Sequence, residues 1–93
     1  DALMMGPFDL SMSLGLRGRT GHPEVVRSLD RILAAGAKAG VDVGCCLFTT
    51  DPAELQAQAR AWKAKGVRIF TNPSEGILLY AAYRSFRQGV AGE

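Results

Sequence analysis

One succession of segments occurs three times along this chain: a short apolar run, a polar loop, and an amphipathic stretch with helical spacing. The apolar runs, which predict strands, cover residues 2–5, 41–48 and 67–71. Strands that alternate with helices are typical of a parallel sheet. The sequence therefore predicts an α/β fold made of three parallel β/α units.

The first predicted helix has a start signal and a stop signal. It begins near Pro23, which fits the first helical position because an N–H at that place has no intrahelical acceptor to lose. His22 is the expected cap, and Gly40 is the expected end. Apolar side chains recur at spacings of three and four and so form one stripe. The members of this stripe are Val25, Val26, Leu29, Ile32 and Leu33.

Two further helices follow. Asp51 and Pro52 predict the start of the second helix, where the Asp51 side chain accepts a hydrogen bond from a first-turn N–H. Its expected buried stripe consists of Leu55, Ala59 and Trp62. The last helix, at residues 75–88, is apolar nearly all the way round, which indicates partners on more than one side. The tail at residues 89–93 is expected to fray.

The length of the chain sets a limit on what these units can form. Its 93 residues suffice for one small domain. Doubly wound folds and (β/α)8 barrels both use a repeat of this size, but a complete barrel needs roughly 250 residues. In a barrel, the three units would be the last three of eight. Because the sequence starts at Asp1, almost inside a strand, we expect it to be cut from a longer chain.

Charge and cysteine usage exclude several classes of function. The net charge is +2, and the eleven basic residues are spread along the chain, which argues against a nucleic-acid partner and against a membrane surface. Arg17 and Arg19 form the densest basic pair. Cys45 and Cys46 are adjacent and have no other cysteine to pair with, which favours a reducing compartment and hence the cytoplasm. No apolar stretch is long enough to span a membrane, and no signal peptide is visible.

Chemistry is expected in the loops that follow the strands, because function in parallel α/β folds gathers at the carboxyl ends of the strands. The three loops cover residues 6–21, 49–52 and 72–76. None carries a glycine-rich phosphate fingerprint, a serine elbow or a zinc-ligand spacing. The first loop is the longest, and it opens with the stretch "GPFD".

Two interpretations of this stretch remain open from the residues alone. A carboxylate at Asp9 can bind a hard divalent cation, while Gly6 and Pro7 shape a corner that leaves the N–H groups of Phe8 and Asp9 free to face an anion. Alternatively, Asp9 caps a short helical turn, because Gly-Pro-x-Asp is also an ordinary turn.

The stretch "LMMGPFDLSMSLGLRGRTGHPEV" resembles the HpcH/HpaI family of class II pyruvate aldolases, which includes 4-hydroxy-2-oxoheptanedioate aldolase. The later stretch "AGVDVGCCLFTTDPAELQAQARAWKAKGVRIF" is also similar to that family. The resemblance implies that residues 1–93 are the carboxyl-terminal part of a single TIM-barrel domain. It also implies a carbon–carbon lyase that uses a divalent cation, Mg²⁺ or Mn²⁺ with Co²⁺ as a further option. The substrates would be a 2-oxo acid, reacting through the enolate of pyruvate, and an aldehyde.

The resemblance also implies roles for individual residues. Asp9 matches the family's metal ligand, and the backbone amides of Phe8 and Asp9 match those that meet the pyruvate carboxylate. Residues at the end of the next strand shape the aldehyde pocket in the family. The implied substrate-binding residues are therefore Gly6, Pro7, Phe8, Asp9, Cys46 and Leu47.

The chain also departs from the family pattern. The family's second metal ligand, a glutamate, and its arginine and histidine for substrate and proton handling lie upstream of the matching stretch. The third loop reads "TNPSEG" where the family tends to have Gly-x-Asp. We therefore expect no catalytic residue within this chain and no activity from the chain alone. The family's last helix exchanges onto a partner subunit, which implies a homo-oligomer formed through residues 75–88.

Two other functions stay open. The first alternative to the aldolase is a non-catalytic interaction module, with exposed strand edges and a two-sided last helix. The second is a relative of the citrate-lyase-like enzymes that cleave CoA thioesters. The second function needs a basic patch for CoA, for which only Arg17 and Arg19 are candidates.

Overall fold

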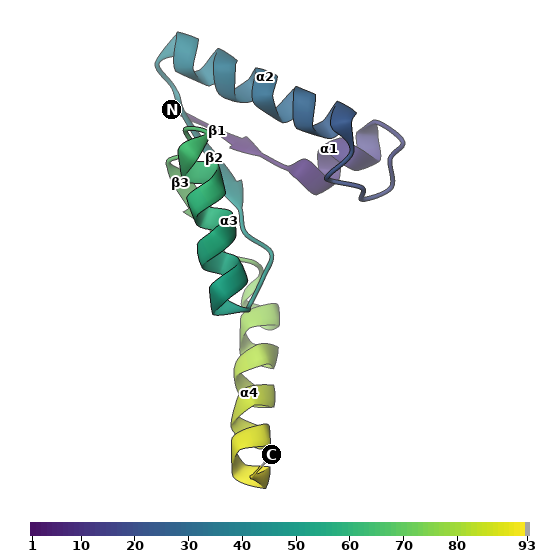
Figure 1. Cartoon of the computed structure of the whole chain (residues 1–93), viewed down its shortest axis with the longest axis vertical. Helices are drawn as coiled ribbons and strands as arrows, with labels where there is room; N and C mark the ends of the chain where they lie inside the picture. Colours follow the sequence, from purple (N-terminus) through teal and green to yellow (C-terminus); the bar gives the residue numbers. More distant parts are fainter. Residues whose placement is uncertain (93) are drawn as a thin grey trace.

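The three expected β/α units are present in the computed structural model of the chain, which describes residues 1–92 (Figure 1). The elements in chain order are β1 (Ala2–Met5), α1 (Pro7–Ser13), α2 (Pro23–Ala39), β2 (Asp42–Cys46), α3 (Pro52–Ala64), β3 (Ile69–Thr71) and α4 (Glu75–Ala91). The strands form one parallel sheet in the order β1-β2-β3, so the predicted α/β fold with a parallel sheet is confirmed.

The strands are shorter than the apolar runs that predicted them. β2 covers five residues of the expected run 41–48, and β3 covers three residues of the run 67–71. Pairing continues by single bonds at the strand ends, where the N–H of Arg68 donates to the carbonyl of Val43 and the N–H of Leu47 to that of Thr71, both at 3.0 Å. The apolar runs therefore extend past the regular ladder on either side.

The helix starts follow the predicted signals. The Nδ1 atom of His22 accepts a hydrogen bond from the N–H of Glu24 at 3.2 Å, and the Asp51 carboxylate accepts one from the N–H of Glu54 at 2.7 Å. α2 ends at Gly40, whose φ of +69° lies in the left-handed region that favours glycine. These three boundaries were predicted correctly because caps act within one turn.

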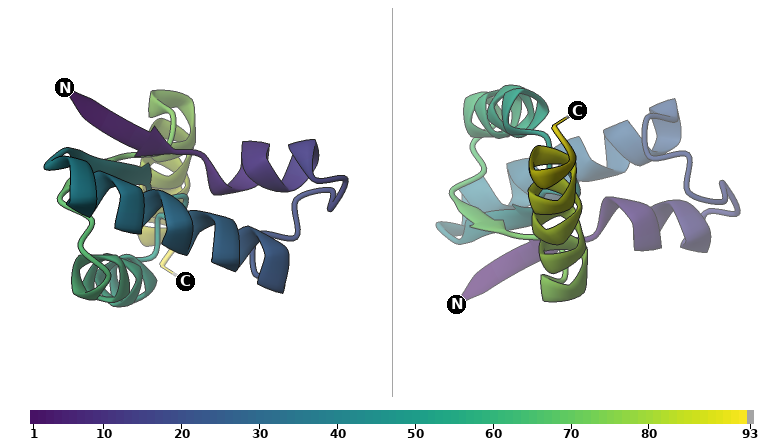
Figure 2. Two further views of the ribbon diagram at one scale, coloured as in Figure 1. Left: turned by 90° about the horizontal axis from the view of Figure 1, so that it is seen from above. Right: turned by 90° about the horizontal axis from the view of Figure 1, so that it is seen from below.

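α2 and α3 cover the same face of the sheet (Figure 2). The buried residues of the core lie between this face and the helices: Met5, Leu16, Val25, Leu29, Val43, Cys45, Leu47 and Val67. Gly36 lets α2 approach β2 closely, because a Cβ at this position would lie 2.5 Å from Cγ2 of Val43 and 3.1 Å from the carbonyl oxygen of Val41.

No described helix covers the opposite face of the sheet (Figure 2). Met4 and Ile69 flank Gly44 on this face, where a Cβ would lie 2.5 Å from the Met4 sulfur and 2.8 Å from Cβ of Ile69. Glycine is therefore the residue that leaves room for these two side chains beside the middle strand.

Three sequence predictions about the elements are wrong. The segment 6–21 is not entirely loop, because α1 forms within it. α3 is less covered than its stripe predicted, since Leu55 is 38% exposed and no residue of this fully described helix is buried. The tail does not fray from residue 89, because α4 continues to Ala91 and Gly92 closes it in the left-handed conformation. The last residue of that predicted tail, Glu93, lies outside the described residues.

α4 runs away from the sheet instead of folding back over it, which gives the molecule extents of 52 × 29 × 21 Å (Figure 1). Most of its large apolar side chains are exposed: Ile77, Leu79, Tyr80, Tyr83, Phe86 and Val90. None of the helices within residues 1–92 is both long and apolar enough to cross a membrane.

The contact at Gly36 yields a test of the packing. Gly36→Ala is expected to lower the free energy of unfolding by about 1–3 kcal/mol, because the added methyl group overlaps Val43 in a filled core. Urea unfolding followed by circular dichroism measures the change. Gly89→Ala, in exposed α4 with nothing near its Cβ, is the matched control and is expected to leave stability unchanged or slightly raised. Equal effects of the two substitutions would contradict this packing.

Candidate functional site

The carboxyl ends of the three strands meet at one edge of the sheet, because the strands are parallel. A cavity of about 750 Å³ lies at this edge. It is lined by Met4, Met5, Gly6, Pro7, Phe8, Asp9, Cys46, Phe48 and Thr71. We call it the mouth cavity. Asp9 is the only charged residue among those that line it.

The "GPFD" stretch forms the corner between β1 and α1. Gly6 is the residue before the helix, Pro7 occupies the first helical position, and the carbonyl of Gly6 accepts a hydrogen bond from the N–H of Leu10 at 2.8 Å. Asp9 lies in the first turn and is exposed. Its carboxylate folds back toward the corner, since a Cβ at Gly6 would lie 3.0 Å from Oδ2 of Asp9.

The structure bears on the capping interpretation of Asp9 and leaves cation binding a prediction. A short helix does follow the corner, as the turn interpretation expected. However, Asp9 lies inside its first turn and not at the cap position, and no side chain in the described chain caps this helix. The N–H groups of Phe8 and Asp9 therefore have neither an intrahelical acceptor nor a capping side chain.

Ser11 holds the corner against the loop that follows α1. It is fully buried, its hydroxyl donates to the carbonyl of Phe8 at 2.6 Å, and its oxygen accepts from the N–H of Gly18 at 3.0 Å. Gly18 also lies against the aromatic ring, because a Cβ there would be 2.9 Å from Cε2 of Phe8. Its φ of +84° suits glycine as well. The position of Phe8 at the mouth cavity thus depends on a hydroxyl group that the sequence did not single out.

The end of β2 and the extended residues that follow it reach the mouth cavity through alternate side chains. Cys46 and Phe48 line the cavity, and the Cys46 thiol lies 3.2 Å from the carbonyl oxygen of Asn72, to which it donates. Leu47 points the other way, into the core, and is only 5% exposed. Successive side chains of a strand face opposite sides, so Cys46 and Leu47 do not reach the same space.

Five of the six substrate-binding residues implied by the resemblance therefore line one cavity, and Leu47 does not. Four lining residues were missed at the sequence level: Met4, Met5, Phe48 and Thr71. The alternation of the strand that carries Cys46 was the available signal for Phe48. Substrate contact by any of these residues stays a prediction.

The other charged candidates lie away from the mouth cavity. Arg17 adopts a positive φ of 49° in the loop between α1 and α2, and the Nε atom of Arg19 donates to the carbonyl of Leu16 at 3.1 Å. His22 caps α2, as described above. Among the described residues, no three histidine, cysteine or acidic side chains gather in a group that could hold a metal ion by themselves.

A family model matches residues 1–73 of the chain, and its description is HpcH/HpaI aldolase/citrate lyase. The chain belongs to this family. The match includes the "GPFD" corner and all three strands, so the resemblance noted from the sequence is confirmed. The family description names two lyase types and does not choose between them.

Named relatives in the family are aldolases. The 2-keto-3-deoxy-L-rhamnonate aldolases of Escherichia coli (strain K12 / DH10B) and Salmonella paratyphi B are 40% and 41% identical to the chain over 73 residues. These alignments cover 74% of this chain but only 25% of each relative. The chain thus spans about a quarter of the length of these relatives.

Two solved structures of HpcH/HpaI proteins share the fold. The family protein from Burkholderia cenocepacia J2315 is 36% identical with a TM-score of 0.74, and the match covers 95% of this chain and 32% of that one. The aldolase from Desulfitobacterium hafniense DCB-2 is 26% identical with a TM-score of 0.63. This match covers 94% of this chain and 32% of that one. Nearly the whole chain is thus matched to about a third of each solved structure.

Cys45 and Cys46, at the end of β2, differ in environment. Both are free, and Cys45 is fully buried. Burial, with the neighbouring Cys46 as a smaller cause, raises the pKa of the Cys45 thiol above its ordinary value of 9.0. The unfolded chain therefore loses this proton at a lower pH than the folded chain, so deprotonation favours unfolding.

We expect the free energy of unfolding to fall as the pH rises above 9.0 through the raised pKa of Cys45. Urea unfolding between about pH 8 and pH 10 measures this slope. Cys45→Ala lowers stability at every pH but is expected to flatten the slope. The matched Cys46→Ala variant should retain most of it. If the slopes are identical in all three proteins, burial of the Cys45 thiol is not the cause.

Proposed function

We propose that the complete protein is an aldolase that forms or cleaves the carbon–carbon bond of 4-hydroxy-2-oxo acids. The observation that carries this proposal is the position of Asp9, next to two free N–H groups at the carboxyl edge of a parallel sheet whose sequence belongs to an aldolase family. The edge is where ligands bind in parallel α/β folds.

The mouth cavity supplies one of the ligands that a hard divalent cation needs. Asp9 offers carboxylate oxygens, which Mg²⁺ and Mn²⁺ prefer, with Co²⁺ a further candidate. A single carboxylate does not complete a site, so the remaining protein ligands would come from segments beyond this chain. When bound, the cation would stabilise the negative charge that develops on the 2-oxo acid.

The corner itself would hold the carboxylate of the 2-oxo acid. The N–H groups of Phe8 and Asp9 supply two donors side by side, and Pro7 removes a third backbone donor that would otherwise compete. Ser11 keeps the Phe8 peptide in place through the bond to its carbonyl. Binding energy would therefore come from backbone groups, and Asp9 would bring the cation to the same substrate.

The site would be completed by the rest of a (β/α)8 barrel, of which the chain would be the last three units. Two features support this proposal. β1 and β3 are edge strands with unpaired backbone groups, and the face with Met4, Gly44 and Ile69 is apolar yet uncovered among the described residues. Further strands would pair with both edges and close the apolar face inside the barrel. Free thiols at Cys45 and Cys46 support a cytoplasmic location.

A hybrid enzyme tests this function. In the Escherichia coli 2-keto-3-deoxy-L-rhamnonate aldolase, the aligned segment is replaced by the corresponding residues of this chain. With Mg²⁺, the hybrid is expected to release pyruvate from 2-keto-3-deoxy-L-rhamnonate, because the upstream residues supply the missing half of the site. The isolated chain is expected to show no turnover in the same assay.

Variants of the hybrid identify the role of the corner. Asp9→Asn is expected to lower kcat/KM roughly 100-fold or more, because an amide binds the cation more weakly. Asp42→Asn, the same change at the opposite edge of the sheet, is the control and should keep activity. Gly6→Ala displaces the Asp9 carboxylate and should raise the Mg²⁺ concentration needed for half-maximal rate. A folded but inactive hybrid, or full activity of Asp9→Asn, would refute the proposal.

We also propose that α4 docks onto a second copy of the complete protein. Its large apolar side chains are exposed on several sides, and a helix of this kind is stable when partners cover it. Tyr83 and Phe86 are each 72% exposed.

Light scattering on the isolated chain tests this contact. The chain is expected to self-associate, and Tyr83→Glu should shift it toward the monomer, because burying a carboxylate in an apolar contact is costly. Ser85→Glu, an added charge at a polar position of the same helix, is the matched control and should change the molar mass less. A monomeric starting chain would show that α4 needs no partner.

A further inference from the structure

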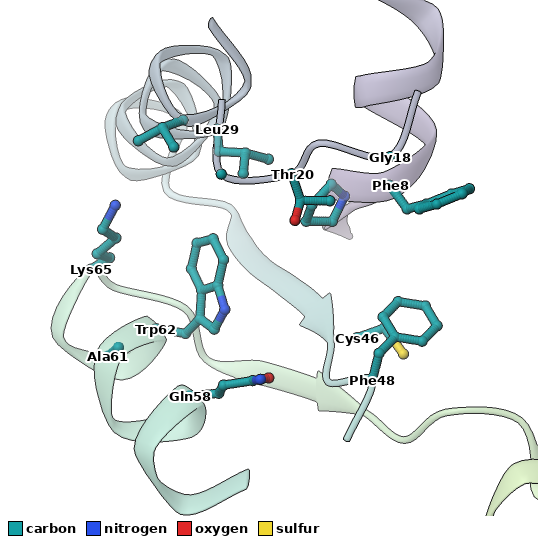
Figure 3. Close-up of a pocket in the computed structure, with 13 residues that line it drawn as sticks. Phe8, Gly18, Thr20, Leu29, Cys46, Phe48, Gln58, Ala61, Trp62 and Lys65 are labelled. Atoms are coloured by element: carbon teal, nitrogen blue, oxygen red, sulfur yellow. The ribbon is translucent and has the colours of Figure 1, made fainter. Parts of the chain in front are cut away.

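A second cavity, of about 550 Å³, lies beside the mouth cavity (Figure 3). It is bounded by the loop after α1, by α2 and by α3. We call it the side groove. Nothing in the proposed chemistry at Asp9 uses it, and its volume is within the range of small-molecule sites, about 300–1,000 Å³.

The side groove and the mouth cavity share part of their lining. Four residues line both spaces: Pro7, Phe8, Cys46 and Phe48. Figure 3 shows Phe8, Cys46 and Phe48 on the side of the groove away from α3, while Trp62 and Gln58 project into it from α3. A molecule held at the mouth can therefore extend past Phe48 toward Trp62 without leaving a lined surface.

The lining of the groove is suited to an apolar occupant. Leu29 contributes from α2, and the indole of Trp62 and the ring of Phe48 supply aromatic surface. Lys65 is the only charged residue in the lining, and its ammonium lies 3.1 Å from the Asp30 carboxylate. A second carboxylate on a ligand would find no free cation among these residues, and a polyhydroxylated chain would find few polar groups.

We propose that the side groove binds the far end of the acceptor substrate, so that the enzyme uses aldehydes with an extended aromatic or other apolar substituent. This inference rests on the proposed aldolase function, because the mouth would hold the 2-oxo acid. Phe48 and Trp62 are the specificity-determining residues. An aromatic ring in the groove gains contact area and an aromatic pairing with Trp62, and Phe48 adds aromatic surface where the groove and the mouth cavity share their lining.

Trp62 allows a direct binding test on the whole chain, because it is the only tryptophan. The probe is 3-phenylpropan-1-ol, an unreactive analogue of the aldehyde, and glycerol is the polar control. We expect a saturable change in tryptophan emission with the probe and none with glycerol. Phe48→Ala should weaken binding roughly tenfold, since one aromatic contact is lost.

Phe86→Ala is the matched control for this titration. Phe86 is about as exposed as Phe48, at 72% against 67%, but lies on α4 far from the groove (Figure 1). Because Phe48 is exposed, its removal does not disturb the core, and Phe48→Leu should give an intermediate affinity. Absence of saturable binding, or an equal loss for Phe48→Ala and Phe86→Ala, overturns the inference.

Selectivity of the hybrid enzyme is the second measurement. For addition of pyruvate, the ratio of kcat/KM for 3-phenylpropanal to that for glyceraldehyde should exceed the ratio of the unaltered Escherichia coli enzyme and fall again in Phe48→Ala. An active hybrid that lacks this shift refutes the groove but leaves the aldolase function standing. Probe binding by the chain together with an inactive hybrid refutes the function instead.

Discussion

The parallel pairing of β2 with a strand on each side is the contact on which the rest of this structure depends. It brings Met5, Cys46 and Thr71 to one edge, although they lie far apart in the sequence. It also determines which residues lie on each face of the sheet. Val43 and Cys45 lie on the face toward the helices, while Gly44 and Cys46 lie on the opposite face. The strand register therefore determines both which side chains line the mouth cavity and which form the core.

The parts of the fold that were predictable from the sequence depend on neighbouring residues. His22 and Asp51 cap their helices through bonds to N–H groups two and three residues away, so the local sequence suffices. The sequence also located the "GPFD" corner, because strand ends are sites of function in this class of fold. The corner alone does not identify the family; the match of the family model over residues 1–73 does.

The parts that were missed depend on distant contacts. A short helical turn after the corner was one of the two expectations, but the bond that ties α1 to the following loop, from the N–H of Gly18 to Ser11, joins residues seven apart, and no local pattern signals it. Leu55 looked buried from its spacing, yet burial needs a neighbour, and α3 meets the sheet mainly through Ala59 and Trp62. Phe48 was overlooked because the apolar run was considered as a block and not as two alternating faces.

The crowding of Gly44 by Met4 and Ile69 has a consequence for how substrates would reach the site in a closed barrel. These side chains lie beside Gly44, two residues below the level of Cys46 and Thr71, and leave no room for even a methyl group on the middle strand. They would act as a plug beneath the mouth cavity on this side of the barrel. Substrates and products would then enter and leave by the same end, and a long substrate would have to extend sideways instead of downward.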